Sequence, residues 1–288
     1  MTPVPVGPAL AELAAEWRRE RRRVLRDPDP EPVHRLRTAT RRLRVGVTIA
    51  TEDLGVGAPP SWAGWKLLRR RLGRLRDLDV LREALKALRA RPGGESDEAL
   101  ADLLARLRRR RRRLRDRALP AVRAASLRRI LAAVEPPTAP GRRAGAGQPL
   151  DRAAVERIAA RWWTRSAEAL AAEPAWQLSP AVNSEDPAHR AAFHAARVRA
   201  RGLRYGLEWW ARLGLRPRAE TVEFLGAVQD ALGAIRDGWR ARRALAGPRF
   251  RRARSILVAS LGVVLAGWPG LAARRDLLGQ PGFDGGSP

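Results

Sequence analysis

The sequence predicts an all-α fold of two four-helix bundles. Segments rich in Ala, Leu and Arg with helical periodicity alternate with short breaks that contain Pro or Gly, and strand-like alternation is scarce. A stretch rich in Pro, Gly and Ala at residues 136–149 divides four predicted helices from four more, an organisation typical of two bundles joined by a linker. With 288 residues, of which 45% are hydrophobic, the chain can bury a substantial core.

The first half, residues 1–135, is predicted to form the first bundle. Asp29 can cap a helix whose first position is Pro30, and this pair of residues favours a helix start. A run of arginines at residues 106–117 covers all sides of the last helix, and it is either a solvated face or an extension of a basic surface. The helices of this half are predicted at residues 9–26, 30–52, 62–91 and 95–134.

The second half, residues 150–275, is predicted to form the second bundle, followed by a flexible tail at residues 276–288. Asp186 and Pro187 repeat the capping arrangement of the first half. The helices of this half are predicted at residues 150–172, 186–213, 217–246 and 249–267.

One segment raises the question of a membrane. Residues 255–273 carry no charge, and their length lies near the lower limit for a helix that spans a bilayer. The Gly and Pro residues within 267–270 favour a buried core helix that breaks there, and a membrane-associated helix is the alternative. The first residues contain no basic region followed by an apolar run, so we predict no signal peptide and a cytoplasmic location.

The two halves share a pattern at an offset of 160 residues. His34, Arg37 and Arg41 correspond in this register to His194, Arg197 and Arg201, and the next basic pair is Arg44 with Arg204. On the following helix, "LGRLRD" at residues 72–77 corresponds to "LGAIRD" at residues 232–237. Matches at one offset on two successive helices indicate an internal duplication.

The repeated residues lie on one face of their helix. At about 100° per residue, positions 34, 37, 41 and 44 fall within an arc of about 80°, and Leu36, Leu43 and Val47 lie roughly opposite. Like charges at this spacing destabilise an isolated helix slightly, so the pattern is explained if an anion supplies the countercharge. Guanidinium groups match phosphate oxygens in a bidentate manner. Two such stripes could line one basic groove that fits a long, repetitive anion.

Composition limits the function classes. Lys and Arg number 57 against 30 Asp and Glu, a net charge of +27 that indicates a polyanionic partner. The chain has no cysteine and three histidines, which excludes disulfides and thiolate metal sites and makes a His-rich metal site implausible. Neither a P-loop nor a Gly-x-Ser-x-Gly motif is present. We therefore expect a binding protein without cofactor, metal or catalytic residues.

The chain resembles the CHAD domain family over about residues 9–275. The resemblance rests on "VHRLRTATRRLR" followed by "LGRLRDLDVL", and on "FHAARVRARGLRY" followed by "VQDALGAIRD". It implies two four-helix bundles related by a pseudo-two-fold axis, with a basic channel between them that binds inorganic polyphosphate. It also implies association with polyphosphate granules.

The family pattern implies which side chains face the ligand. Arg42 corresponds to Gly202, while Lys66 and Arg69 correspond to Gly226 and Gln229, so the groove is expected to be stronger on the first half. The predicted ligand-binding residues are His34, Arg37, Arg41, Arg42, Arg44, Lys66, Arg69, Arg76, His194, Arg197, Arg199, Arg201, Arg204 and Arg236.

The main alternative is a nucleic-acid-binding or architectural basic protein, with nucleic acid otherwise a weaker competitor. Trp162–Trp163 and Trp209–Trp210 could stack on single-stranded bases, although core packing is the more common role of tryptophan in apolar helices. A phosphohydrolase is a third, more remote reading. Whether the protein is a monomer or a homodimer is left open by the sequence.

Overall fold

A computed structural model gives the structure of the protein over residues 4–91, 97–134, 150–180 and 186–284. These residues form helices and their connections, and within them the extended pairing is limited to one isolated bridge between Pro217 and Phe283. The prediction of an all-α fold is therefore confirmed. The predicted linker at residues 136–149 lies outside the described residues.

The first half of the chain forms the helices α1 to α5. Their bounds are Val6–Arg26 for α1, Pro30–Thr48 for α2, Ala63–Arg89 for α3, Glu98–Ala124 for α4 and Arg128–Val134 for α5, and a π-helical turn at Ile49–Asp53 follows α2. The prediction of a single helix over 95–134 is wrong, because the chain is extended at Ala125. There the Ser126 hydroxyl accepts a hydrogen bond from the Arg128 N–H, and the Ser126 carbonyl accepts one from Trp65.

The second half forms the helices α6 to α10. Their bounds are Arg152–Ala171 for α6, Pro187–Arg212 for α7, Ala219–Ala244 for α8, Arg251–Ala266 for α9 and Trp268–Ala273 for α10, with 3₁₀ turns at Pro174–Gln177, Pro248–Phe250 and Arg274–Gly279. The predicted cap of α7 is confirmed, since the Asp186 carboxylate accepts from the Ala188 N–H at 2.8 Å. Asp29 precedes α2 as predicted but makes no side-chain cap bond.

The segment at 255–273 breaks where its glycines predicted. The helix α9 ends at Ala266, and α10 begins at Trp268, which stacks on Trp176 with 5.3 Å between ring centroids. Within the described ranges, every helix is either too short or too polar to cross a bilayer.

The chain end also differs from the predicted tail at 276–288. Leu278 is buried, the Gln280 carbonyl accepts from the Trp163 indole N–H at 2.8 Å, and the Gly282 carbonyl accepts from the Arg218 N–H at 3.1 Å. Residues up to Asp284 are therefore packed on α6 and on the start of α8. The prediction missed this packing because the hydrogen bond from the Trp163 indole joins two distant segments and leaves no pattern in the sequence.

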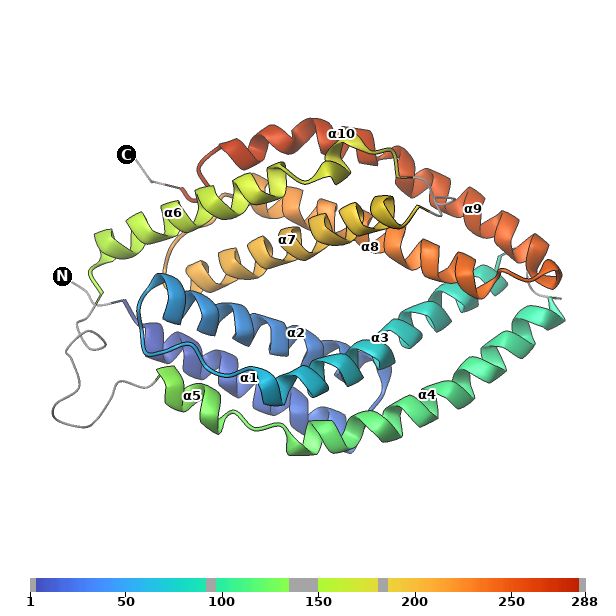
Figure 1. The fold of residues 1–288 in the computed structure, drawn as a ribbon, viewed down its shortest axis with the longest axis horizontal. Coiled ribbons are helices and arrows are strands. Elements are labelled where there is room, and N and C mark those ends of the chain that lie inside the picture. The colour runs from blue at the N-terminus through green and yellow to red at the C-terminus, as the bar shows by residue number, and fades with distance from the viewer. Residues whose placement is uncertain (1–3, 92–96, 135–149, 181–185, 285–288) are drawn as a thin grey trace.

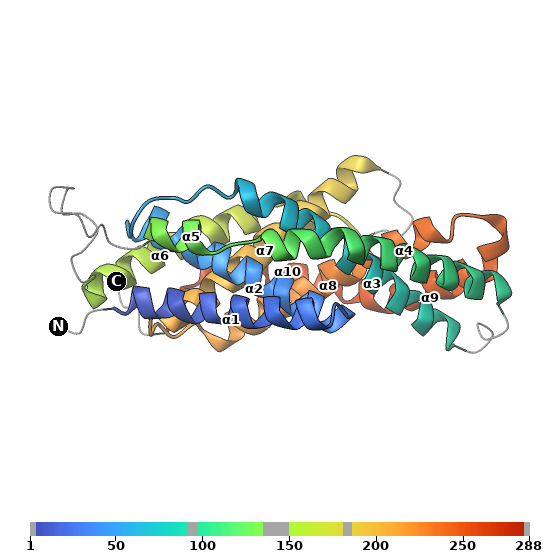
Figure 2. The ribbon, with the colours of Figure 1, turned by 90° about the horizontal axis from the view of Figure 1, so that it is seen from below.

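The molecule is flattened, with α1–α5 on one side and α6–α10 on the other (Figure 1). Seen edge-on in Figure 2, the helices form a thin slab. The helix α2 contacts α7 across the middle, and α3 contacts α8. Both hydrophobic clusters draw side chains from the two halves, so the division into two bundles at residues 136–149 stays a prediction.

Two glycines in equivalent positions let tryptophans enter the core. A Cβ on Gly46 of α2 would lie 2.8 Å from the Trp209 ring of α7, and a Cβ on Gly206 of α7 would overlap the Trp162 ring. These positions are 160 residues apart, as in the sequence repeat. Trp162, Trp163, Trp209 and Trp210 are all buried, which supports core packing as their role.

We expect Gly46→Ala to lower the free energy of unfolding by about 1–3 kcal/mol, because the added methyl group overlaps Leu13 and Trp209. The control is Gly226→Ala in α8, where a Cβ would meet nothing within 4 Å. There the better helix propensity of Ala should raise stability by up to about 1 kcal/mol. Chemical denaturation of both variants measures the two effects, and equal effects would contradict close packing at Gly46.

Candidate functional site

Packing of the apolar faces of α2 and α7 turns their basic faces toward the space between the two halves. Leu36 and Leu43 of α2 and Leu203 and Leu207 of α7 are buried. Positions 41–50 and 201–210 have the same pattern of burial residue by residue. The arginine stripes are therefore presented in the same way by the two helices.

The stripes converge, as their electrostatic coupling shows. Burial and the Arg41 charge lower the pKa of Arg201 to about 9. Burial lowers the pKa of Arg37 to about 9 as well, helped first by Arg41 and also by Arg201. The pKa of Arg197 falls to about 10 because of burial, Arg236 and, more weakly, Arg41. Repulsion between α2 and α7 arginines requires that the two rows lie close together.

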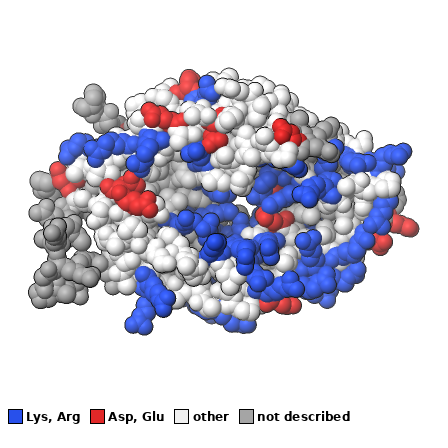
Figure 3. All heavy atoms as spheres, viewed as in Figure 1, with Lys and Arg blue, Asp and Glu red and all other residues white. Residues whose placement is uncertain are grey.

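Three cavities lie along this basic region, and Figure 3 shows Lys and Arg gathered in the hollowed middle of the face. The first, about 610 Å³, is lined by Arg37, Arg41, Arg44, Lys66, Arg69 and Arg201 among others. The second, about 660 Å³, shares Arg41, Arg44, Arg69 and Arg201 with it and extends to α6. The third, about 250 Å³, contains His194, Arg197 and Arg236. We call the region formed by these cavities the basic groove.

Most of the groove arginines have no carboxylate partner. Among the described residues, no Asp or Glu oxygen lies within ion-pair distance of the following groove side chains: Arg37, Arg41, Arg44, Lys66, Arg69, Arg197 and Arg201. The buried Nε of Arg197 also lacks a hydrogen-bond acceptor among these described residues. Uncompensated charge of this kind is stabilised by a bound anion.

Gly73 of α3 makes room for one of these arginines. A Cβ at this position would lie 2.9 Å from Nη1 of Arg37. Gly233, the equivalent residue of α8, faces open space, so the close contact at Gly73 is not repeated in the second half.

Asp77 orients two arginines across the boundary between the halves. Its carboxylate pairs with Arg236 at 3.1 Å and with Arg240 at 2.7 Å, both on α8. Burial alone would raise the pKa of Asp77, but the Arg240 hydrogen bond and the charges of Arg240 and Arg236 outweigh it and lower the pKa. Asp77 is therefore an ion-pairing residue that holds two arginines of α8 at the groove.

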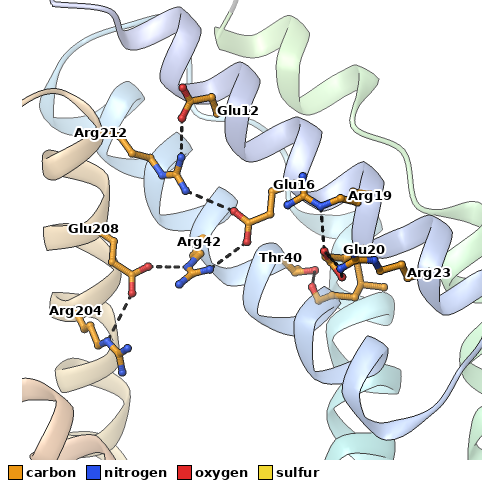
Figure 4. Close-up of polar contacts among 11 residues, drawn as sticks. Glu12, Glu16, Arg19, Glu20, Arg23, Thr40, Arg42, Arg204, Glu208 and Arg212 are labelled. Carbon is orange, nitrogen blue, oxygen red and sulfur yellow. Dashed lines mark hydrogen bonds and ion pairs between the residues drawn. The ribbon is translucent and has the colours of Figure 1, made fainter.

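Arg42 does not face the groove, contrary to prediction. Its guanidinium pairs with Glu208 of α7 at 2.6 Å and with Glu16 of α1 at 3.1 Å (Figure 4). The same network holds Arg212, and Arg204 approaches Glu208 at 3.6 Å. Arg42 is one residue, about 100°, away from Arg41 on the helix, which directs it out of the basic stripe.

Arg199 also differs from the prediction that it adds free charge. It lines the second cavity, but its Nε donates to the buried carboxylate of Glu173. His34, Arg76 and Arg204 line none of the three cavities. His34 is exposed, and the charge of Arg76 acts on it directly.

The two histidines are tuned by their surroundings in the same direction. Both residues are exposed, yet the surrounding protein shields part of each imidazole from water. This partial desolvation, followed by the charge of Arg76, lowers the pKa of His34. Partial desolvation and then Arg197 lower the pKa of His194. In the free protein both imidazoles are therefore more readily neutral than an ordinary histidine, and a polyanion would shift them back toward the charged form.

Sequence reasoning missed the end of the stripe on α8. Arg240 and Arg243 line the third cavity with Trp239. They follow Arg236 at the helical spacing of four and three residues, a signal that could have extended the stripe. Their counterparts in α3 are Val80 and Glu83. The second half is thus richer in charge at this end, so the groove is not simply stronger on the first half.

The arginine run of α4 lies outside the three cavities. One member, Arg111, has a structural role, because it pairs with the fully buried Asp79 at 2.6 Å and donates to the Pro28 carbonyl. Exposed members of the run are Arg106, Arg108, Arg109, Arg110, Arg112, Arg113 and Arg117. They form a separate basic surface on the outside of the molecule.

Residues 8–246 match the sequence profile of the CHAD domain. A solved CHAD domain structure from the plant Ricinus communis is similar, with 22% identity and a TM-score of 0.65 over 98% of this chain and 94% of that chain. PptA from Streptomyces chartreusis is similar at 21% identity, with a TM-score of 0.52 over 96% of this chain and 98% of that one. Among curated proteins, no significant sequence match is found. At these identities the two structures support the fold alone.

We predict opposite stability effects for two neighbouring arginines. Arg201→Gln removes a buried, repelled cation, so the unfolding free energy should stay constant or rise by up to about 1 kcal/mol at low ionic strength. Arg42→Gln leaves Glu16 and Glu208 without their partner and should lower it by about 1–3 kcal/mol. Denaturation of both variants without polyanion provides the measurement. A loss at Arg201 as large as at Arg42 would assign Arg201 a structural role.

Proposed function

This chain belongs to the CHAD domain family, and on that premise we propose that it binds inorganic polyphosphate in the basic groove. The observation that carries the proposal is the convergence of unpaired arginines from α2, α3 and α7 on one groove, which α8 also lines with Arg236 and Arg240. Burial and then the repulsion among them lower the pKa values of Arg37, Arg197 and Arg201. This repulsion is relieved when phosphate oxygens occupy the groove.

The shape of the groove favours an extended anion. The two larger cavities share several arginines, and Arg201 of α7 lines both of them. Arg197, which lines the third cavity, is coupled to Arg41 of the first two. A chain of phosphates can contact such a row at every unit, whereas a compact anion would neutralise only part of it.

Nucleic acid is the second candidate. The outer arginines of α4 favour it, because they form an open basic surface that a duplex could approach. The predicted stacking role of the paired tryptophans loses support, since Trp162, Trp163, Trp209 and Trp210 are at most 7% exposed. We propose a binding role without catalysis, and we propose polyphosphate granules of the cytoplasm as its setting.

A salt titration tests the proposal. Long-chain polyphosphate should remain bound at salt concentrations that release single-stranded DNA, and both affinities should fall as salt rises. If DNA of equal charge displaces polyphosphate one for one, the groove is a general polyanion site and the proposed specificity is lost.

The variant Arg41→Gln with Arg201→Gln should weaken polyphosphate binding at least about tenfold, because two charge-assisted contacts are removed. The matched control is Arg35→Gln, since Arg35 is exposed on α2 and pairs with Glu31 at 2.7 Å, away from the cavities. Binding curves at fixed salt measure both. An equal loss in the control would indicate a diffuse charge effect.

We expect polyphosphate affinity to rise as pH falls below about 6.5, the ordinary pKa of histidine. In the free protein the pKa values of His34 and His194 are lowered, while a bound polyanion favours the imidazolium, so binding takes up protons. Affinity measured from pH 5.5 to 8 at constant ionic strength should lose this slope in the double variant His34→Gln, His194→Gln. An unchanged slope would exclude the histidines as its origin.

A further inference from the structure

The third cavity of the groove differs from the other two in its walls. It lies between α7 and α8, has a volume of about 250 Å³ and combines arginines with an apolar side formed by Phe193, Leu232 and Trp239. The Phe193 and Trp239 rings meet edge to face, with centroids 5.8 Å apart and planes at 86°. Phe193 is buried, and Trp239 is half-buried at the cavity.

The polar side of the cavity is held in place by carboxylates. Arg236 pairs with Asp77 at 3.1 Å and with Asp237 at 3.2 Å, and Arg240 pairs with Asp77 at 2.7 Å. These pairs leave hydrogen-bonding capacity unused. The buried Nη1 of Arg240 and the buried Nε of Arg197 have no hydrogen-bond acceptor within the part of the chain that the structure describes. Since buried donors are nearly always satisfied, two of them at one cavity indicate a ligand with acceptor oxygens.

A chain of phosphates uses only half of such a site. It would occupy the arginines but gain no contact from the apolar side of the cavity. A ligand that carries phosphates next to a planar, weakly polar group would use both sides, because ligand sites combine an apolar wall with a few convergent polar groups. Bases pack on aromatic side chains regardless of their sequence identity.

We propose that this cavity binds a nucleoside polyphosphate, with the base on the Phe193–Trp239 wall and the phosphates at Arg197, Arg236 and Arg240. The volume of about 250 Å³ is small for a whole nucleotide of this kind, so the base and the nearest phosphates occupy it. The remaining phosphates extend along the groove toward Arg201 and Arg41. These two arginines lie near Arg197, because the charge of Arg41 lowers the pKa of Arg197 and the charge of Arg197 lowers the pKa of Arg201. The proposal rests on the proposed function in one respect, the phosphate-binding role of the groove arginines.

Titration calorimetry with ATP and with tripolyphosphate, without magnesium and at equal ionic strength, tests this proposal. The two ligands have similar charge, but only ATP has a base and a ribose. ATP should bind at least about tenfold more tightly, as expected for one base packed on an aromatic wall. Equal affinities, or a preference for tripolyphosphate, would overturn the proposal without the need for any variant.

Two tryptophan variants locate the base. Trp239→Leu should remove the preference for ATP and leave tripolyphosphate affinity unchanged, and Trp239→Phe should keep most of the preference. The matched control is Trp62→Leu, since Trp62 is also half-buried and lines the first cavity of the groove. If Trp62→Leu removes the preference and Trp239→Leu does not, the base binds elsewhere and the assignment to the third cavity is wrong. Thermal melting confirms that each variant is folded.

The two proposals fail in different ways. If the protein binds long-chain polyphosphate but does not prefer ATP to tripolyphosphate, the proposed function is supported and the nucleotide site is rejected. If the protein prefers ATP in a way that depends on Trp239 but does not bind long-chain polyphosphate, the nucleotide site is supported and the proposed function is rejected.

Discussion

The structure depends on holding like charges together against their mutual repulsion. Burial, together with the close approach of Arg41, lowers the pKa of Arg37 and of Arg201 to about 9. Packing on the opposite helix faces supplies the opposing free energy, because Leu43 and Leu207 are buried and Trp209 of α7 enters the space left by Gly46. The core that spans both halves thus keeps the groove charged and ready for an anion.

Carboxylates divide the arginines of the groove region into two groups. Arg42 pairs with Glu16 and Glu208 and ties α2 to α1 and α7, whereas its neighbour Arg41 pairs with none of the described acids. Arg236 and Arg240 are an intermediate case, since Asp77 and Asp237 orient them, while the buried Nη1 of Arg240 has no hydrogen-bond acceptor among the described residues. An arginine with no acid within ion-pair distance is available for a ligand, whereas one that pairs with an acid stabilises the fold. The residue type alone does not show which of these roles an arginine has.

The helices were predictable because their signals are local. Periodicity and the Asp-Pro starts placed α2 and α7 to within a few residues, and the glycines near 267 marked the break before α10. The break after α4 and the packed chain end were missed, because both depend on indole hydrogen bonds from Trp65 and Trp163 to residues more than 60 positions away. Contacts between distant segments leave no periodic trace in the sequence.

For the groove, the sequence by itself determined the family, the all-α class and the repeated face that carries His34, Arg37, Arg41 and their counterparts. Helical spacing fixes which side chains share a face, and that requires no knowledge of neighbouring helices. Only the tertiary structure decided which of those cations remain unpaired, since it pairs Arg42 and Arg199 with acids. It also adds Arg240, which Asp77 holds in place, to the lining of the third cavity. The reason is that pairing depends on distances of a few ångströms between helices, which are set by how their apolar faces pack.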